Sequence, residues 1–470
     1  MWNLLGFTES PYDTRPLAPV AADMGMLVAR TSEATEFLTT LDSRSDGVAI
    51  ISGAPGVGKT SFLNVQQYRM AHGLSLYGPK VLPAYMLTPI NPGDDALDVA
   101  RRVVQNLVKS IERHCDELSL AIPEQTGKIR KWVSAHGASG FDIGLQIFGC
   151  GGNIARSTEV PALSDATFER LHEVISALVS EAVKELGVDS VIVVLDNIEN
   201  LENEELQRLL MTFRDTIFTS PDVWWVLIGQ SGLGSLVREL DPRIADRMEG
   251  VGLELKPISV DDLHKAVELR VQKFSNRGGG QAPIPRSVHK LLYDASNKEI
   301  RFAFKYANTI CTRYVKSMRD QAMVIVEAGR ANGKFANLHR NDIDEVIGDL
   351  VVEKPLEVDY AEEILKQIAT DELQVSALSR KELQVLHAIG EKGAARGKDH
   401  DHFGVSSNQQ FSSRFLVPLR ERQLLARKQE GRGVIYTLRG LAALGYKYSL
   451  LDAGPAAAGA GADIDSGEDD

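Results

Sequence analysis

Three short apolar segments in the first half of the chain have the pattern of strands that are buried on both faces. They cover residues 47–52, 191–195 and 223–228 and read GVAIIS, VIVVL and VWWVLI. Continuous apolar runs of this length are typical of central strands in a parallel sheet. Helical patterns follow the first two strands, at residues 60–71 and 203–218. This alternation of strands and helices predicts an α/β fold with a parallel sheet.

A glycine-rich loop joins the first strand to the first helix. Residues 53–60 read GAPGVGKT, a complete G-x-x-x-x-G-K-[ST] phosphate-binding loop. Its glycines let successive backbone N–H groups point at phosphate oxygens, and the helix N-terminus behind it favours negative charge. We predict that Lys59 reaches the β- and γ-phosphates of ATP and that the Thr60 hydroxyl binds Mg²⁺. The residues predicted to hold the nucleotide are Gly53, Ala54, Pro55, Gly56, Val57, Gly58, Lys59, Thr60 and Ser61.

The second strand ends in an acid that can complete the nucleotide site. Asp196 is predicted to hold Mg²⁺ next to Thr60, although an Asp here can also simply cap a buried strand. Many P-loop ATPases place Glu directly after this Asp, but here the position is Asn197, whose amide positions water without accepting its proton. Glu199 can substitute only if the strand end bends suitably. We therefore predict slow or partner-stimulated hydrolysis, as in a switch that is held by its nucleotide.

Further candidate residues for contacting the phosphates of the nucleotide follow the third strand. Gln230 is the candidate γ-phosphate sensor, although an ordinary polar strand-to-loop turn explains this position nearly as well. Arg243 and Arg247 lie one helical turn apart, and the planar guanidinium group suits a phosphate that belongs to a neighbouring subunit. The alternative for this pair is a surface salt bridge with Asp246 or Glu239.

The order of these segments resembles that of AAA+ ATPases, and within them the initiator clade of origin-recognition and related bacterial ATPases. The resemblance rests on GAPGVGKT, VIVVLDN, a polar-ended strand and then DPRIADRMEG…LELKPISVDDL, and it covers residues 25–320. It implies a helical lid whose sensor arginine is Arg301, ATP-dependent assembly into a homo-oligomer, and contact of residues 27–30 with adenine, although the usual Gly-Arg-Glu form is missing there. Asn197 also makes the chain similar to STAND-type signalling ATPases, which often act as slow switches.

The last third of the chain has a different pattern. Ser379 and Glu382 have the spacing of a capping box, and the apolar positions after them predict a helix that Gly390 ends. A second helix is predicted to start at Ser406 or Ser407 and to kink or end at Pro418. Two short strands at 424–428 and 433–438 flank a turn, so the segment resembles a winged helix-turn-helix domain. The candidate DNA contacts are Asn408, Gln409, Arg414, Arg427, Lys428 and Arg432.

The fold class predicted for the whole chain is therefore α/β, with a P-loop AAA+ core and a helical lid, followed by an α+β winged helix-turn-helix domain. A glycine-containing β-hairpin insertion is expected at residues 137–157, either as a contact with DNA or a neighbouring subunit or as a plain surface hairpin. The predicted domains are an N-terminal lead-in (1–45), the ATPase core (46–256), the helical lid (257–320), a helical connector (321–375), the winged helix domain (376–449) and a disordered acidic tail (450–470).

Charge is distributed unevenly along these domains. The whole chain of 470 residues carries a formal net charge of −12, yet residues 376–449 contain 13 Lys and Arg against 6 Asp and Glu. A basic module on an acidic body indicates one polyanion-binding segment, for which duplex DNA is the predicted partner. Winged helices also bind proteins, so a protein surface remains the alternative.

The cysteines, the N-terminus and the length of the apolar runs indicate where in the cell the protein is expected. The three cysteines, Cys115, Cys150 and Cys311, form no C-x-x-C pair, which suits a reducing cytoplasm. The acidic, proline-containing N-terminus does not resemble a signal peptide, and no apolar run approaches 18 residues, so no membrane association is expected. The resulting hypothesis is a cytoplasmic, oligomerising ATPase that couples its ATP state to DNA binding, in replication or transposition targeting, plasmid maintenance or defence against foreign DNA. The alternative is a STAND-like switch whose winged helix binds a separate effector protein.

Overall fold

The computed structural model describes residues 1–75, 77–134, 163–248, 252–276, 280–331, 340–430 and 433–452. It divides into two compact units, one formed by residues 14–270 and the other by residues 1–13 together with 271–470. The insertion expected at 137–157, Cys150, Arg432 and the tail from residue 453 onward lie outside the described residues. Within the described residues, no helix combines the length and the apolar character that crossing a bilayer requires.

The unit of residues 14–270 is built on a six-stranded sheet in which the described pairings are all parallel. The strand order is β2-β4-β5-β1-β6, and β3 also pairs with β4. The predicted α/β core is confirmed, because the three apolar segments form the three longest strands. The strands are β1 (Gly47–Gly53), β2 (Val81–Leu82), β3 (Thr88–Pro89), β4 (Ser190–Asp196), β5 (Val223–Gly229) and β6 (Leu253–Leu255).

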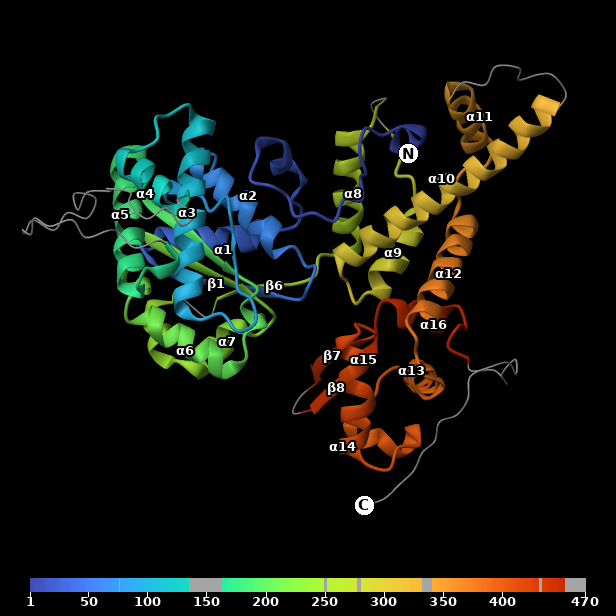
Figure 1. The fold of residues 1–470 in the computed structure, drawn as a ribbon. Helices are drawn as coiled ribbons and strands as arrows, with labels where there is room; N and C mark the ends of the chain where they lie inside the picture. Colours follow the sequence, from blue (N-terminus) through green and yellow to red (C-terminus); the bar gives the residue numbers. More distant parts are fainter. Residues whose placement is uncertain are drawn as a thin grey trace, which may run out of the picture. The chain divides into compact units, whose positions relative to one another are not determined.

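Helices cover both faces of this sheet (Figure 1). Because side chains alternate along a strand, Trp224 packs with the helices of one face and Trp225 with those of the other, and both are fully buried. One face is covered by α1 (Thr31–Asp42) and α2 (Lys59–Ala71). The other is covered by α3 (Ala96–Leu118), α5 (Phe168–Leu186), α6 (Asn203–Arg214) and α7 (Leu233–Leu240), with α4 (Glu124–Ser134) packed against α3 and α5.

The helix predicted at 203–218 is shorter in the structure. It ends at Arg214, whose guanidinium group pairs with Asp215 and Asp241, each at 2.6 Å. The chain then turns into a separate 3-10 turn, η6 (Ile217–Thr219). The apolar residues of this turn continue the buried helix pattern, so the sequence alone did not show the break.

The second unit is mostly helical. α8 (Val260–Phe274) crosses the boundary between the units and is followed by α9 (Arg286–Ala295), α10 (Ile300–Ala331), α11 (Arg340–Glu353) and α12 (Val358–Val375). The first 13 residues belong to this unit because they pack on its helices. The buried Tyr12 hydroxyl lies 3.0 Å from His289 Nε2 and accepts the Ile284 N–H at 3.3 Å.

The C-terminal part of this unit, residues 379–447, is called here the C-terminal module. It contains α13 (Arg380–Lys392), η8 (Gly397–Phe403), α14 (Asn408–Phe411), the π-helical turn η9 (Ser412–Leu416), α15 (Val417–Glu421), an antiparallel ribbon of β7 (Leu425–Glu430) and β8 (Gly433–Leu438), and α16 (Leu441–Lys447). Its buried core contains Leu386, Phe411 and Leu425.

The predicted helix start at Ser379 is confirmed, and the predicted stop at Gly390 is wrong. Ser379 and Glu382 form the reciprocal hydrogen bonds of a capping box. The helix runs past Gly390 to Lys392 and ends at Gly393, which has a φ of 80°. Gly390 has a packing role instead, since a Cβ there would lie 2.3 Å from the Tyr446 ring.

Pro418 reshapes the second helix of the C-terminal module, as predicted. Ser407 caps α14 by accepting the Gln410 N–H at 3.2 Å. Proline has no N–H to donate, and its ring clashes with the carbonyl group four residues earlier, so a regular α-helix is disfavoured at this point. The helix widens instead into the π turn η9, where the Val417 N–H bonds to the Ser412 carbonyl, before α15 continues.

Candidate functional site

The phosphate-binding loop lies between β1 and α2. Gly56 and Gly58 have φ angles of 71° and 99°, which favour glycine, and Gly58 is the N-cap of α2. A Cβ on Gly53 would come within 2.7 Å of the Leu255 carbonyl oxygen, so β6 can pack there only against glycine. Lys59 Nζ donates to the Gly53 carbonyl at 2.8 Å and to the Ala54 carbonyl at 3.3 Å. The ammonium group is therefore held over the loop, where phosphate oxygens can replace these carbonyl groups.

Arg30 supports this loop from behind, a role that the sequence did not reveal. Its side chain is buried and donates to the Val57 carbonyl at 3.0 Å and to Glu33 at 2.7 Å. Partial burial would raise the pKa of the Glu33 carboxyl, but the hydrogen bond from Arg30 brings that pKa below its ordinary value. Val57 itself is buried in the core beneath the loop. The loop is thus fixed by an apolar anchor and a charged clamp, and Arg30 is a positioning residue.

Residues before α1 are fixed against the first turns of α2. The Leu17 N–H donates to the Ser61 hydroxyl at 3.0 Å, and Asn64 Nδ2 donates to the Leu17 carbonyl at 2.9 Å. The Ser61 side chain therefore holds the chain at Leu17. The part of Ser61 left for a nucleotide is its backbone N–H near the helix N-terminus, and its predicted contact with the nucleotide stays a prediction.

Parallel register brings the other predicted residues to the same edge of the sheet. Ser52 on β1 pairs with Gly229 on β5, and Leu195 on β4 pairs with Leu227 on β5. Asp196 and Gln230 therefore lie at the carboxyl ends of β4 and β5, level with the start of the phosphate-binding loop. β1 and β4 are two strand spacings apart, about 10 Å. This spacing separates the phosphate-binding loop, which follows β1, from Asp196 at the end of β4.

The chain bends sharply after Asp196. Asn197 has a φ of 61°, a left-handed conformation that asparagine tolerates better than glutamate, and its side chain is exposed. A 3-10 turn, η5 (Ile198–Asn200), follows and brings Glu199 back over β5. A Cβ on Gly229 would lie 3.1 Å from Glu199 Oε2. The bend required for Glu199 to reach the carboxyl edge of the sheet is therefore present.

Arg243 and Arg247 lie at the opposite edge of the sheet. They line a cavity of about 480 Å³ together with Gly47, the first residue of β1. The seven residues of β1 separate this cavity from the phosphate-binding loop by about 20 Å. Arg243 is exposed, whereas Arg247 is half-buried and donates to the Phe218 carbonyl at 3.3 Å. Neither arginine is placed to contact the nucleotide of its own chain.

Several charged side chains gather around this cavity. Arg44 donates to the Arg247 carbonyl, and Arg214 forms its ion pairs with Asp215 and Asp241 nearby. The hydrogen bond from Arg214, with further attraction from Arg243 and Arg247, lowers the pKa of the Asp215 carboxyl. Among the described residues, four arginines and three aspartates line the cavity, so charges of both signs meet at this edge of the sheet.

The other candidates lie in the second unit. Arg301 is exposed at the start of α10, the late helix that the resemblance implies, and its role toward the phosphates stays a prediction. In the C-terminal module, the side chains of Asn408, Gln409, Arg414, Arg427 and Lys428 are all exposed. Arg427 pairs with Tyr436 across the ribbon, and Lys428 pairs with Ile435.

Comparison with known protein families identifies the unit of residues 14–270. A model described as the KAP family P-loop domain matches residues 30–229, from the Arg30 clamp to the last residue of β5. This match and the parallel sheet together show a P-loop NTPase core. No curated protein matches the chain.

Solved structures of low similarity span nearly the whole chain. The Aeropyrum pernix ORC2 protein in ADPNP–ADP complexes is 14% identical with a TM-score of 0.44, covering 95% of this chain and 98% of that one. Cdc6p from Pyrobaculum aerophilum is 14% identical with a TM-score of 0.35, covering 94% and 97%. The Aeropyrum pernix ORC1 protein in complex with DNA is 15% identical with a TM-score of 0.36, covering 91% and 95%. Similarity at this level assigns no function to the chain.

Removal of the Arg30 clamp tests how far the loop depends on it. Arg30→Ala leaves the Val57 carbonyl without its buried donor, so we expect unfolding free energy to fall by about 1–3 kcal/mol and ATP affinity to fall about tenfold. Calorimetric titration with ATP and thermal unfolding measure the two effects. Glu33→Gln keeps Arg30 in place and should cost less of both. An Arg30→Ala chain that unfolds earlier but binds ATP like the wild type would show that the clamp does not shape the loop.

Proposed function

We propose that this chain is an ATP-dependent switch of the AAA+ initiator type, in which nucleotide state controls binding to duplex DNA. One observation carries the proposal: the phosphate-binding loop, Asp196 and Gln230 share the carboxyl edge of one parallel sheet. In this arrangement Lys59 neutralises the β- and γ-phosphates of ATP. Thr60 and Asp196 hold Mg²⁺, and Gln230 contacts the γ-phosphate.

Hydrolysis at this site is slow, and Glu199 is its general base. Asn197 cannot accept a proton, while the turn at η5 brings the Glu199 carboxylate to Gly229 at the end of β5. A carboxylate delivered by a turn is less rigidly placed than one that directly follows the strand. The geometry thus favours a long-lived ATP state over rapid turnover.

Loss of the Glu199 carboxylate separates binding from chemistry. We expect Glu199→Gln to lower the turnover of ATP by about 10²-fold, because general base catalysis contributes on that scale, and to leave ATP affinity within about twofold. Phosphate release under steady-state conditions and ATP titration measure the two quantities. Glu204→Gln, an exposed carboxylate on α6, is the matched control. Unchanged turnover in Glu199→Gln would remove Glu199 from the mechanism.

Assembly completes the site in this proposal, with Arg243 reaching the nucleotide of a neighbouring subunit. Its support is position: the arginine is exposed at the amino edge of the sheet, about 20 Å from the loop of its own chain. Arg301, exposed at the start of α10, is the proposed sensor arginine of the lid.

Mixing of inactive variants distinguishes a neighbour's arginine from an internal one. Lys59→Ala and Arg243→Ala should each be inactive alone, and their mixture should recover about a quarter of wild-type turnover, the share of interfaces that pair an intact loop with an intact arginine. Lys59→Ala mixed with Glu199→Gln is the control, since both changes affect the same chain's site and no recovery is expected. If the Arg243→Ala mixture also stays inactive, Arg243 does not act between subunits.

DNA is the partner that the C-terminal module fits best. Gln409 on α14 and Arg414 on η9 are exposed residues of the types that contact base edges and phosphates, and the ribbon adds Arg427 and Lys428. This module has more basic than acidic residues although the whole chain is acidic. The local positive charge supports a phosphate backbone as the target.

Salt dependence tests this assignment. The double change Arg427→Ala with Lys428→Ala should weaken duplex binding and lower the slope of log K against log salt by about 2, one for each phosphate contact. Mobility shifts with ATP and with ADP, at several salt concentrations, supply the measurement. Lys316→Ala with Arg319→Ala, two exposed cations on α10, serves as control. A wild-type chain that binds no duplex in either nucleotide state would support the STAND-like alternative, with a protein effector on this surface.

A further inference from the structure

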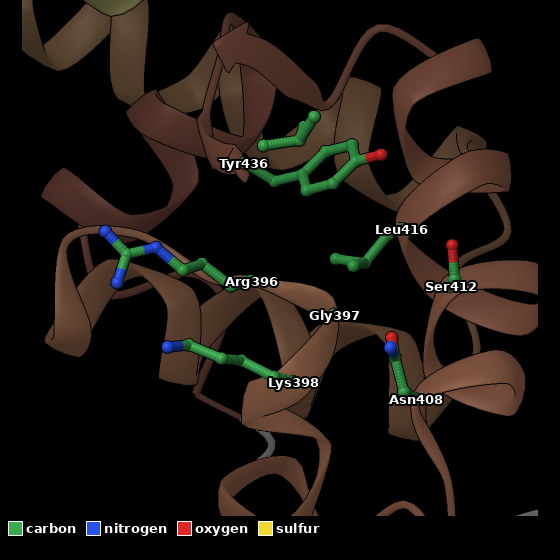
Figure 2. A pocket seen from close by; sticks show the side chains of 8 residues that line it. Arg396, Gly397, Lys398, Asn408, Ser412, Leu416 and Tyr436 are labelled. Carbon is green, nitrogen blue, oxygen red and sulfur yellow. The ribbon is translucent and has the colours of Figure 1, made fainter. Parts of the chain in front are cut away.

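The C-terminal module contains a pocket of about 480 Å³ whose walls come from three separate segments. Arg396 and Lys398 flank the start of η8, Asn408 and Ser412 come from α14 and η9, and Tyr436 comes from β8. Figure 2 shows the two basic side chains projecting to one side of the hollow, with Asn408 and Ser412 on the other side and the Tyr436 ring between these sides. The volume lies within the range of sites for small molecules.

Specific contacts build this pocket. Ala395 and Tyr436 exchange two backbone hydrogen bonds, both 2.8 Å long, which place Arg396 beside the ribbon. A Cβ on Gly397 would lie only 2.2 Å from Asn408 Oδ1, so the absence of a side chain lets the Asn408 amide occupy this position. The π turn η9 begins at Ser412, and such turns occur frequently at functional sites.

The charges and surfaces of the pocket are complementary to a nucleotide. The described lining residues include two cations and no acid. Two acids lie close by: Asp399 pairs with Lys392 at 2.9 Å and accepts the Arg396 N–H at 2.8 Å, and Asp401 contacts His400 at 3.1 Å. Arginine and lysine suit a phosphate group, an aromatic ring offers a stacking surface to a base, and an asparagine amide matches the donor and acceptor edge of adenine.

We infer that this pocket binds one nucleotide, with its phosphate at Arg396 and Lys398 and its base between Tyr436 and the Asn408 amide. The nucleotide is either free in solution or an unpaired unit of a nucleic acid strand. The second source rests on the proposed DNA binding, and the first does not. The sequence predicted Asn408 as a contact to the DNA groove. In either case of this inference, Asn408 acts inside the pocket instead.

Free nucleotide is tested on the full chain with a non-hydrolysable ATP analogue occupying the phosphate-binding loop. Equilibrium dialysis with radiolabelled dAMP and dTMP should show one bound nucleotide per chain. Gly397→Ala, which displaces Asn408, and Lys398→Ala, which removes an exposed cation, should each weaken binding about tenfold. Lys381→Ala, an exposed cation on α13 outside the pocket, is the control and should bind like the wild type. Lys398→Ala keeps the test decisive if Gly397→Ala proves unstable in thermal unfolding.

An unpaired unit is tested with two duplexes of the same sequence, one fully paired and one carrying a single bulged 2-aminopurine. We expect about tenfold tighter binding of the bulged duplex, with a change in 2-aminopurine fluorescence, and loss of this preference in Gly397→Ala while the paired duplex still binds. Binding in either test that depends on Gly397 or Lys398 supports the pocket. The inference is overturned if dAMP, dTMP and the bulged base all fail to bind, or if both variants bind them like the wild type. Failure of the wild type on every duplex contradicts the proposed DNA binding, while the dialysis result still decides on the pocket.

Discussion

Parallel pairing of β1 with β5, and of β5 with β4, is the constraint on which the nucleotide site depends. The pairing is driven by burial, because alternate residues such as Trp224 and Trp225 are fully enclosed on opposite faces of the sheet. A slip of one residue would exchange the two faces, so the register is strongly specified. The same register sets the carboxyl ends of three strands level, and the phosphate-binding loop, Asp196 and Gln230 meet there as a consequence.

The charged residues of the candidate site lie at two opposite edges of the same sheet. Lys59 and Glu199 lie at the carboxyl edge, and in the proposed function they act on the nucleotide of their own chain. Arg243 and Arg247 line a cavity at the amino edge, about 20 Å from the phosphate-binding loop of their own chain. In the proposed switch, contact of the nucleotide with two chains links its occupancy to assembly.

The C-terminal module shows how one imperfect element can create a site. Pro418 prevents a regular helix, and the resulting π turn at Ser412 widens the segment next to the ribbon. Gly397 provides the complementary feature, since the space its missing side chain leaves is taken by Asn408. Two residues that disfavour regular helices thus shape the surroundings of a pocket in a module with more basic than acidic residues.

The sequence by itself determined those features that depend on neighbours in the chain: the strand, loop and helix around Lys59, the strand that ends in Asp196, and the capping box at Ser379. Local periodicity and glycine placement are sufficient for these. Where a distant residue intervened, local patterns failed, as at Gly390, which packs against Tyr446 and does not end its helix. Only the tertiary structure placed Arg30 beneath Val57, Glu199 over Gly229, and Asn408 against Gly397. Each of these contacts joins segments through packing or hydrogen bonds that no short stretch of sequence encodes.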